Sequence, residues 1–292
     1  MQIIHAQHMG MCFGVRDAIA LAAEQSETRP LTILGDLVHN PTVTADLRAR
    51  GVAIAHDLAD VRTKTVMVTA HGASDLMLAK TRGLGFDVVE ATCPLVHVAH
   101  KAVRALVRDG YHPVIVGQRG HVEVRGLTED LDEFDVVLDE ADIRSLAARP
   151  RIGVAAQTTQ SIGKVRHLVA LIRERFPQSD VRFIDTVCQP TKQRQNAAVE
   201  LARRCDVVIV IGGANSNNTR ELVKTCREHF PQVRHIQSEL DLHREWFVSA
   251  GTVGITAGTS TPEAVIERVD RRIREFAAAP ESVTASAGSR VG

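Results

Sequence analysis

The feature that most constrains the fold is a repeated alternation of short apolar runs with longer amphipathic segments. Each apolar run is followed by Gly, His or hydroxyl residues and then by a helical pattern. The predicted strands are Ile3–His5, Leu31–Leu34, Val66–Thr69, Phe86–Val89, Val114–Val116, Val136–Leu138, Ile152–Ala155, Val181–Ile184, Val207–Ile211, Val233–Ile236 and Val253–Thr256. Because apolar strands that alternate with helices form parallel sheets covered on both faces, we expect an α/β fold.

Length and composition limit the class of protein. A chain of 292 residues predicts two or three small α/β units. A formal charge of +0 and only 3% aromatic residues argue against a nucleic-acid partner. No apolar run is long enough to span a bilayer, and the N-terminus lacks the pattern of a signal peptide. Five widely spaced cysteines are typical of a reduced, cytoplasmic protein, and the tail 277–292 is predicted to be disordered.

Unusual residues gather where the predicted strands end, which is where parallel sheets bind ligands. Cys93 follows one strand and precedes Pro94, which suits the first turn of a helix. The positive end of that helix favours the thiolate form of Cys93. The alternative is a small buried cysteine at a strand–helix junction.

Cys12, Cys93 and Cys188 each lie between a predicted strand and a predicted helix, whereas Cys205 and Cys226 are expected to be packing residues. Zinc sites usually contain close Cys-x-x-Cys pairs, which the chain lacks. Iron–sulfur clusters tolerate widely spaced thiolates, and three ligands leave one iron of a 4Fe–4S cluster open. Spacing alone leaves open that these are three unconnected thiols.

Polar donors accompany these cysteines. His39, His71 and His121 follow strands, and imidazole donates hydrogen bonds to phosphate oxygens. Further neutral donors at predicted helix starts are Ser216, Asn217, Asn218 and Ser260. So many donors with few lysines or arginines favour a diphosphate site, although the hydroxyl residues also suit helix caps and turns.

Glu123 lies two residues after His121, on the same side of an extended segment. A carboxyl group near a bound anion has a raised pKa, which suits a proton donor. Thr158 and Thr159 are candidates to orient Glu123 or the substrate. The alternative for Glu123 is an exposed loop acid.

Nine motifs in one order give the chain a specific resemblance. They are Gly10-Met11-Cys12-Phe13-Gly14-Val15, Val38-His39-Asn40, Ala70-His71-Gly72, Ala91-Thr92-Cys93-Pro94-Leu95-Val96, Gly120-His121-Val122-Glu123, Gln157-Thr158-Thr159, Asp185-Thr186-Val187-Cys188 continuing to Arg194-Gln195, Asn215-Ser216-Asn217-Asn218 and Thr256-Ala257-Gly258-Thr259-Ser260. In these residues the chain resembles the 4-hydroxy-3-methylbut-2-enyl diphosphate reductase (LytB) family over residues 1 to 276.

The resemblance implies three similar α/β lobes around a central 4Fe–4S cluster. The expected lobes are 13–93, 94–184 and 185–276, with strand 1–12 completing the third. Cys12, Cys93 and Cys188 would be the cluster ligands. Glu123, Thr158 and His121 would be catalytic, and the substrate would contact His39, His71, His121, Thr158, Ser216, Asn217, Asn218 and Ser260.

The implied reaction is the last step of the methylerythritol phosphate route to isoprenoids. The substrate hydroxyl would bind the open iron, two electrons would enter singly, and Glu123 would help to deliver a proton as the C–O bond breaks. The products would be isopentenyl and dimethylallyl diphosphate. A ferredoxin or flavodoxin would supply the electrons to a cytoplasmic monomer or weak homodimer, with no nucleic-acid or membrane partner.

The chain departs from the family pattern at several positions. Met11 stands where Phe is usual, Val122 replaces a Pro and Asn217 replaces a frequent Ser, while Gln189-Pro190 differs from the commoner continuation. Without the proline we expect Glu123 to be less rigidly held. The rival interpretations are a quinolinate synthase-like iron–sulfur dehydratase and a non-catalytic iron–sulfur or isoprenoid-diphosphate binding paralogue.

Overall fold

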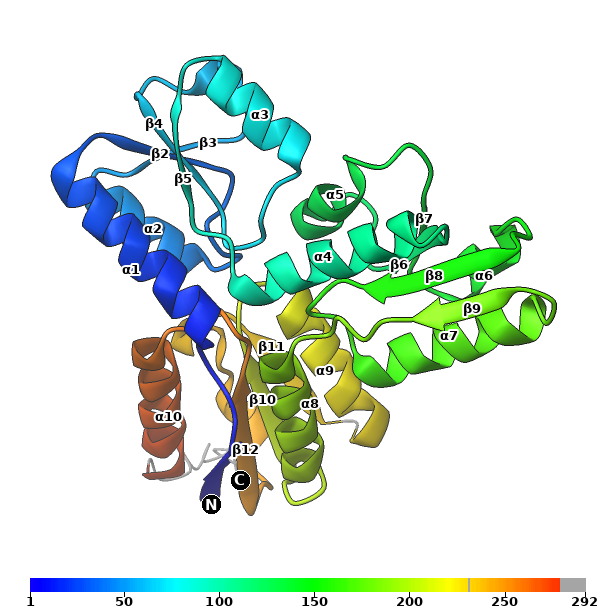
Figure 1. Cartoon of the computed structure of the whole chain (residues 1–292). Coiled ribbons are helices and arrows are strands. Elements are labelled where there is room, and N and C mark those ends of the chain that lie inside the picture. The colour runs from blue at the N-terminus through cyan, green and yellow to red at the C-terminus, as the bar shows by residue number, and fades with distance from the viewer. Residues whose placement is uncertain (231, 279–292) are drawn as a thin grey trace, which may run out of the picture.

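The described residues of the computed structural model, 1–230 and 232–278, form three parallel four-stranded sheets flanked by helices (Figure 1). The strand orders are β3-β2-β4-β5, β7-β6-β8-β9 and β1-β12-β10-β11. The α/β class predicted from the alternating pattern is therefore confirmed. We call these sheets, with the helices packed on them, the first, second and third lobes.

The elements have the following bounds. The strands are β1 (Gln2–His5), β2 (Leu31–Leu34), β3 (Ala53–Ala55), β4 (Thr65–Val68), β5 (Asp87–Glu90), β6 (His112–Val116), β7 (Asp135–Val137), β8 (Arg151–Ala156), β9 (Asp180–Phe183), β10 (Val207–Ile211), β11 (Val233–Ile236) and β12 (Thr252–Ala257). The helices are α1 (Phe13–Thr28), α2 (Pro41–Ala49), α3 (Asp75–Gly83), α4 (Pro94–Arg108), α5 (Val122–Thr128), α6 (Glu140–Ser145), α7 (Ile162–Arg175), α8 (Gln189–Ala202), α9 (Asn217–His229) and α10 (Glu263–Ala278), with short 3-10 helices at Leu58–Asp60, Glu239–Asp241 and Arg244–Phe247.

All eleven predicted strands are present, within one or two residues of their expected bounds. A twelfth strand, β3, is not predicted by the alternating pattern; it contains one large apolar residue, Ile54, and pairs with β2 at the edge of its sheet. The tail prediction is wrong at Ala277 and Ala278, which complete α10. The rest of that tail, 279–292, lies outside the described residues.

The three lobes share one strand order. If β10 is counted as the first strand of the third lobe, the first strand of each lobe lies between the second and the third, and a fourth strand lies beyond the third at the edge. In the third lobe β1 occupies this fourth position, since Gln2 pairs in parallel register with Thr252. The chain connections therefore leave in opposite directions from β2 and β4, from β6 and β8, and from β10 and β12. Such topological switch points create ligand-binding crevices at the carboxyl ends of the strands.

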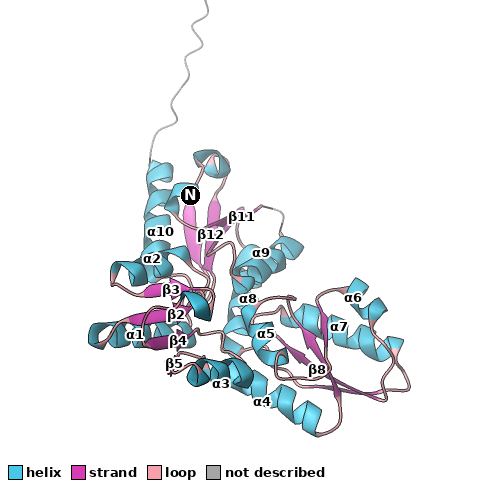
Figure 2. Cartoon of the chain, turned by 90° about the horizontal axis from the view of Figure 1, so that it is seen from above, coloured by secondary structure: helices cyan, strands magenta, loops and turns pink. Residues whose placement is uncertain are grey.

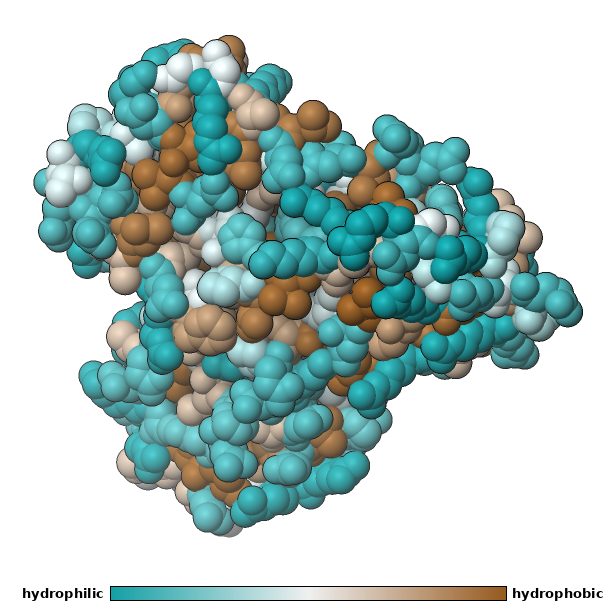
Figure 3. Space-filling model, viewed as in Figure 1, coloured by the Kyte–Doolittle hydropathy of each residue, from teal (hydrophilic) through white to brown (hydrophobic). Residues whose placement is uncertain are grey.

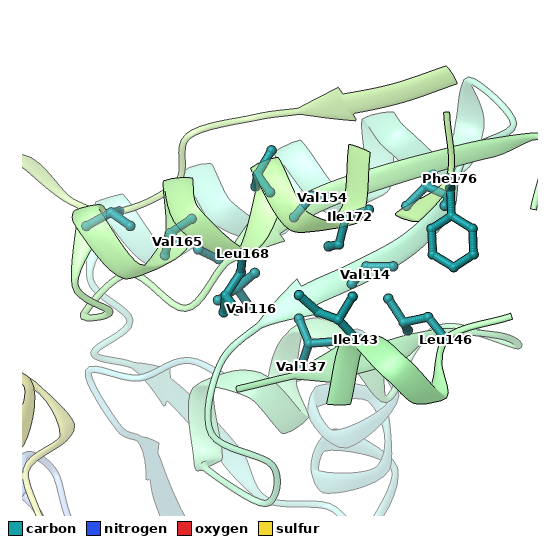
Figure 4. Packing of buried hydrophobic residues seen from close by; sticks show 14 residues of the cluster. Val114, Val116, Val137, Ile143, Leu146, Val154, Val165, Leu168, Ile172 and Phe176 are labelled. Atoms are coloured by element: carbon teal, nitrogen blue, oxygen red, sulfur yellow. The ribbon is translucent and has the colours of Figure 1, made fainter. Parts of the chain in front are cut away.

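Apolar side chains pack on both faces of each sheet. In the second lobe α6 and α7 cover one face, where Val114, Val154, Leu168 and Ile172 are almost fully buried (Figure 4). The opposite face is covered by α4 and α5. In the third lobe α10 packs on one face and α8 with α9 on the other (Figure 1).

The lobes meet at the centre of the molecule, and each extends away from it in its own direction (Figure 2). The visible surface is mostly hydrophilic, with apolar patches on the upper lobe and where the lobes adjoin (Figure 3). Asp130 of the second lobe accepts the backbone N–H groups of Asp75 and Leu76 in the first, at 2.8 and 2.9 Å. None of the described helices combines the length and the apolar character needed to cross a membrane.

Candidate active site

Two connected hollows lie where the lobes meet. An inner cavity of about 80 Å³ contains every residue that the sequence analysis proposed for the site. They are Cys12, His39, His71, Cys93, His121, Glu123, Thr158, Cys188, Ser216, Asn217, Asn218 and Ser260. An outer cleft of about 670 Å³ shares His39 and His121 with it. The two hollows therefore adjoin each other at these histidines.

The shared strand order explains why these residues converge. The first and third strands of each lobe, which flank its crevice, are followed by polar site residues. These are His39 and His71 in the first lobe, His121 and Thr158 in the second, and Ser216 and Ser260 in the third. The fourth strands β5, β9 and β1 instead lead to Cys93, Cys188 and Cys12. Each lobe thus supplies equivalent positions to one cavity.

Each of the three cysteines is the N-cap residue of a helix and makes no side-chain capping bond there. Gly14 lets the chain pass close to Cys93, because a Cβ at Gly14 would lie 2.4 Å from the Cys93 sulfur. Cys205 and Cys226 pack in the core of the third lobe, as expected. All five cysteines are free thiols.

The expectation that the helix end lowers the pKa of Cys93 is wrong for the free thiol. Burial raises that pKa, and hydrogen bonds from the backbone of Leu95 and Val96 only partly oppose it. Burial likewise raises the pKa of Cys188 to about 11. Burial thus keeps Cys93 and Cys188 protonated in the free protein, and a ligand carrying strong positive charge, such as a metal centre, deprotonates such thiols on binding.

A hydrogen-bonded chain links Cys188 to the third lobe. Cys188 Sγ lies 3.1 Å from Thr191 Oγ1, which in turn lies 3.4 Å from Asn218 Nδ2. The backbone N–H of Thr259 donates to Asn218 Oδ1 at 2.9 Å. The sequence analysis missed Thr191, although its position one helical turn after Cys188 is a signal that it shares the face of the cysteine.

The three histidines form a compact cluster. The rings of His39 and His71 stack with centroids 4.4 Å apart, and that of His121 stands edge-on at 5.2 and 5.5 Å from them. Burial lowers the pKa of all three, to about 3 for His121 and well below the usual value for His71, where the other two histidines add to the effect. The free cluster therefore consists of neutral imidazoles at neutral pH.

The ligand atoms of these histidines lie within 4.8 Å of one another, close enough for a metal ion. The hydrogen bond to His121 argues for an anion instead. The backbone N–H of Glu123 donates to His121 Nδ1 at 3.1 Å, so the neutral ring carries its proton on Nε2. That nitrogen is a donor with no lone pair for a metal. Neither ring nitrogen of His39 has a hydrogen-bond partner among the described residues. Asp36 Oδ2 lies 3.8 Å from Nδ1, so Nε2 is the nitrogen whose position indicates a missing polar ligand.

The third lobe supplies neutral polar groups opposite the histidines. Ser216 caps α9 by accepting the N–H of Thr219 at 3.3 Å, so the predicted capping role is confirmed. Asn217 Nδ2 donates across the lobes to Thr159 Oγ1 at 3.1 Å. Ser260 Oγ is 3.4 Å from the carbonyl oxygen of His39, a long contact that leaves its hydroxyl free to turn toward a ligand.

Glu123 is 1% exposed, so the alternative of a solvated loop acid is wrong. The backbone N–H of Thr158 donates to Glu123 Oε1 at 2.6 Å, and the N–H of Glu123 is held by His121. These contacts fix Glu123 without a proline at position 122. Burial raises its pKa to about 7 even though both the backbone and the side chain of Thr158 oppose that shift. At neutral pH Glu123 is therefore balanced between carboxyl and carboxylate.

Comparison with known proteins identifies the family. The family model described as LytB protein matches residues 3–274. The chain belongs to the LytB family. Among curated LytB relatives, the 4-hydroxy-3-methylbut-2-enyl diphosphate reductase of Pelobacter propionicus is 37% identical over 94% of this chain and 99% of its own length. The Aquifex aeolicus protein of the same name is 38% identical over 94% of this chain and 96% of its own length.

Solved structures of the same family have this fold. The E-1-hydroxy-2-methyl-but-2-enyl-4-diphosphate reductase of Plasmodium falciparum superposes with a TM-score of 0.87 at 25% identity, covering 92% of this chain and 87% of its own. A second solved structure, of an (E)-4-hydroxy-3-methyl-but-2-enyl diphosphate reductase, has a TM-score of 0.65 at 35% identity over 94% and 99% of the two chains. As a LytB protein, the chain is an iron–sulfur oxidoreductase.

The donor set suits the iron–sulfur cluster that LytB proteins bind. Cys12, Cys93 and Cys188 border one cavity, and none is joined in a disulfide. The other two cysteines, Cys205 and Cys226, lie in the core of the third lobe, so the cavity offers three thiolate ligands. Thiolate ligands from three separate helices match the requirements of an iron–sulfur cluster.

Proposed function

We propose that this protein reductively removes the hydroxyl group of 4-hydroxy-3-methylbut-2-enyl diphosphate, the last step of the methylerythritol phosphate route. The products would be isopentenyl and dimethylallyl diphosphate. The observation that carries the proposal is the meeting, in one inner cavity, of three cysteines, a three-histidine cluster and a buried glutamate with a raised pKa. The names of the curated relatives support the same substrate.

Cys12, Cys93 and Cys188 would hold one 4Fe–4S cluster. When bound, such a cluster supplies Lewis acidity toward the substrate hydroxyl and delivers electrons one at a time. The protein contributes a buried site for it, since all three sulfurs border the same cavity at helix N-caps. Water exclusion at such a site strengthens the interactions of the substrate with polar groups of the protein.

The diphosphate would lie between the histidines and the third lobe. His39, His71 and His121 would donate ring N–H groups to phosphate oxygens, and the tautomer of His121 already directs its Nε2 proton away from the backbone. On the other side the donors would be Ser216, Asn217, Asn218 and Ser260. The first turn of α9 adds unpaired backbone N–H groups, which favour an anion.

Glu123 would supply a proton. Because Thr158 donates its N–H to Oε1, the proton resides on Oε2 in the carboxyl form. The net reaction consumes two electrons and two protons: the C–O bond breaks, one proton leaves with the oxygen as water, and the other forms a C–H bond. The hydroxyl of Thr158 would orient Glu123 and the substrate hydroxyl from the neighbouring strand end.

The electrons would come from a ferredoxin or a flavodoxin. We place the protein in the cytoplasm, where a reducing environment suits five free cysteines and an oxygen-sensitive cluster. A monomer or a weak homodimer would suffice, because every proposed site residue comes from this one chain. The predicted lobe boundaries 13–93, 94–184 and 185–276 remain part of this proposal, with α10 extending the third lobe to Ala278.

The test is anaerobic reconstitution followed by turnover with reduced methyl viologen, a one-electron donor. The proposal requires formation of both isopentenyl and dimethylallyl diphosphate. A protein that holds the cluster and binds the diphosphate, but forms neither product with a competent donor, would instead be a binding paralogue.

A further inference from the structure

Arg220 stands at the rim of the inner cavity. It is the fourth residue of α9 and lines the outer cleft together with His39 and His121, but it does not border the inner cavity itself. It therefore lies where an anion seated among the histidines would extend toward the cleft. The sequence motifs assign Arg220 no role, although a cation two residues after Ser216-Asn217-Asn218 is a detectable signal.

The guanidinium of Arg220 bridges two lobes through neutral partners. Its Nη1 donates to the carbonyl oxygen of Ala214 at 3.3 Å, and its Nη2 donates to Oε1 of Gln118 in the second lobe. Gln118 is anchored by its own backbone N–H, which donates to Gln157 Oε1 at 3.1 Å. No carboxylate of a described residue forms an ion pair with Arg220. Two of its five N–H donors are used, so others remain available to an anion.

The position of Arg220 is unfavourable unless an anion is nearby. The first turn of α9 contains no acidic residue, and the positive end of a helix dipole repels a cation placed there. The charge of Arg220 also acts on the histidines. Burial is the main cause of the lowered pKa of His39 and of His121, and in both cases Arg220 lowers the pKa further, although at His39 the carboxylate of Asp36 opposes this effect. A bound phosphate would reverse both unfavourable interactions.

We propose that Arg220 is a specificity residue that contacts the outer phosphate of a bound diphosphate, and thereby favours diphosphates over monophosphates. This inference rests on the proposed function, because it assumes that the inner phosphate lies in the histidine cluster. A monophosphate bound by the three histidines would not extend as far as Arg220. Gln118 orients the planar guanidinium, which offers two parallel N–H groups to a phosphate where the ammonium of lysine offers only a point charge.

Arg125 provides a matched control. It lines the same outer cleft and carries the same charge, but it lies on α5 with an exposed side chain and has no resolved effect on the pKa of the histidines. A general attraction of anions to the cleft would affect both arginines equally. A specific contact to the outer phosphate would affect Arg220 alone.

The experiment measures binding of inorganic diphosphate and of orthophosphate by anaerobic titration calorimetry on the cluster-loaded enzyme, in wild type, Arg220→Gln, Arg220→Lys and Arg125→Gln. We expect Arg220→Gln to weaken diphosphate binding roughly tenfold to a hundredfold, as for loss of a hydrogen bond between charged groups, and to change orthophosphate binding less than about threefold. Arg220→Lys should recover part of the loss, and Arg125→Gln should resemble wild type. In turnover, Arg220→Gln should raise KM more than it lowers kcat.

The inference is overturned if Arg220→Gln weakens the binding of diphosphate and of orthophosphate equally. It is also overturned if Arg220→Gln and Arg125→Gln have equal effects on binding. A purely structural bridge is distinguished by Gln118→Ala, which removes the contact between the lobes and keeps the charge. If Gln118→Ala weakens the binding of diphosphate and of orthophosphate alike, the bridge between the lobes and not a contact to the outer phosphate is responsible. If the wild-type enzyme itself does not bind diphosphate, the proposed substrate site fails rather than the role of Arg220 alone.

Discussion

Replacing Glu123 by glutamine tests the proton donor. The amide side chain of the Glu123→Gln variant would keep an oxygen to accept the N–H of Thr158 and would fill the same volume, so the cavity should retain its shape. Only the ability to carry a transferable proton is lost. General acid catalysis contributes roughly 100- to 10,000-fold, so we expect kcat to fall by that factor while KM changes less than about threefold.

The pH dependence of the turnover rate tests the role of Glu123 independently. A general acid acts in its protonated form, and the pKa of Glu123 is raised to about 7 by burial. The wild-type rate should therefore be constant below that pH and fall about tenfold per unit above it. Reduced methyl viologen suits this assay because its potential does not vary with pH. The rate of Glu123→Gln should be low and should not show this change of slope (the break) near pH 7.

The same substitution should raise the free energy of unfolding above neutral pH, whereas it lowers the catalytic rate. Because the folded state holds the Glu123 proton more tightly than the unfolded state, wild type loses stability as pH rises from about 4.5 to about 7. In cluster-free protein, Glu123→Gln removes this loss and should be more stable than wild type by about 3 kcal/mol at pH 8. Urea unfolding at pH 5 and pH 8 measures the difference.

Glu129 supplies the control, since it lines the outer cleft from the end of α5 and accepts a hydrogen bond from Ser74 at 2.5 Å. Glu129→Gln makes the same chemical change outside the inner cavity, and we expect wild-type kcat and the wild-type break near pH 7. The reasoning is refuted if Glu123→Gln is fully active, or if its rate keeps that break.

Three further perturbations test the cluster site and the contact between the lobes. Cys93→Ser should abolish the cluster, seen as loss of bound iron and sulfide, whereas Cys226→Ser, in the core, should retain both; equal loss would refute the ligand assignment. Gly14→Ala should lower the iron content of folded protein, because its Cβ would lie 2.4 Å from the Cys93 sulfur, and unchanged iron would contradict that packing. Asp130→Ala removes the acceptor of two backbone N–H groups of the first lobe and should cost about 1 kcal/mol in urea unfolding; no change would show that this cap does not stabilise the protein.

Much of the fold follows from the sequence because its central strands are short, apolar and largely buried. Val207–Ile211, for example, is recognisable as a central parallel strand from its composition alone. The edge strand Ala53–Ala55 was missed because two of its three residues are alanine, which has low strand propensity.

The site residues were found because strand ends of parallel sheets carry ligands, but their electrostatics depended on packing. Whether the helix dipole or burial decides the pKa of Cys93 cannot be read from the sequence, and burial proved larger. The hydrogen bond that holds Oε1 of Glu123 likewise comes from Thr158, which follows β8, a different strand of the second lobe from β6, which precedes Glu123. The tautomer of His121 follows from a backbone N–H whose direction only the fold defines. Arg220 was missed because its partner, Gln118, lies 102 residues away in another lobe.

The most direct test of the account is one assay on the wild-type protein. Anaerobically reconstituted enzyme should hold about four irons and four sulfides per chain, as a 4Fe–4S cluster requires. Supplied with 4-hydroxy-3-methylbut-2-enyl diphosphate and reduced methyl viologen, it should release isopentenyl and dimethylallyl diphosphate, with two electrons consumed per product. Full cluster content and tight diphosphate binding without either product would contradict the proposed reaction.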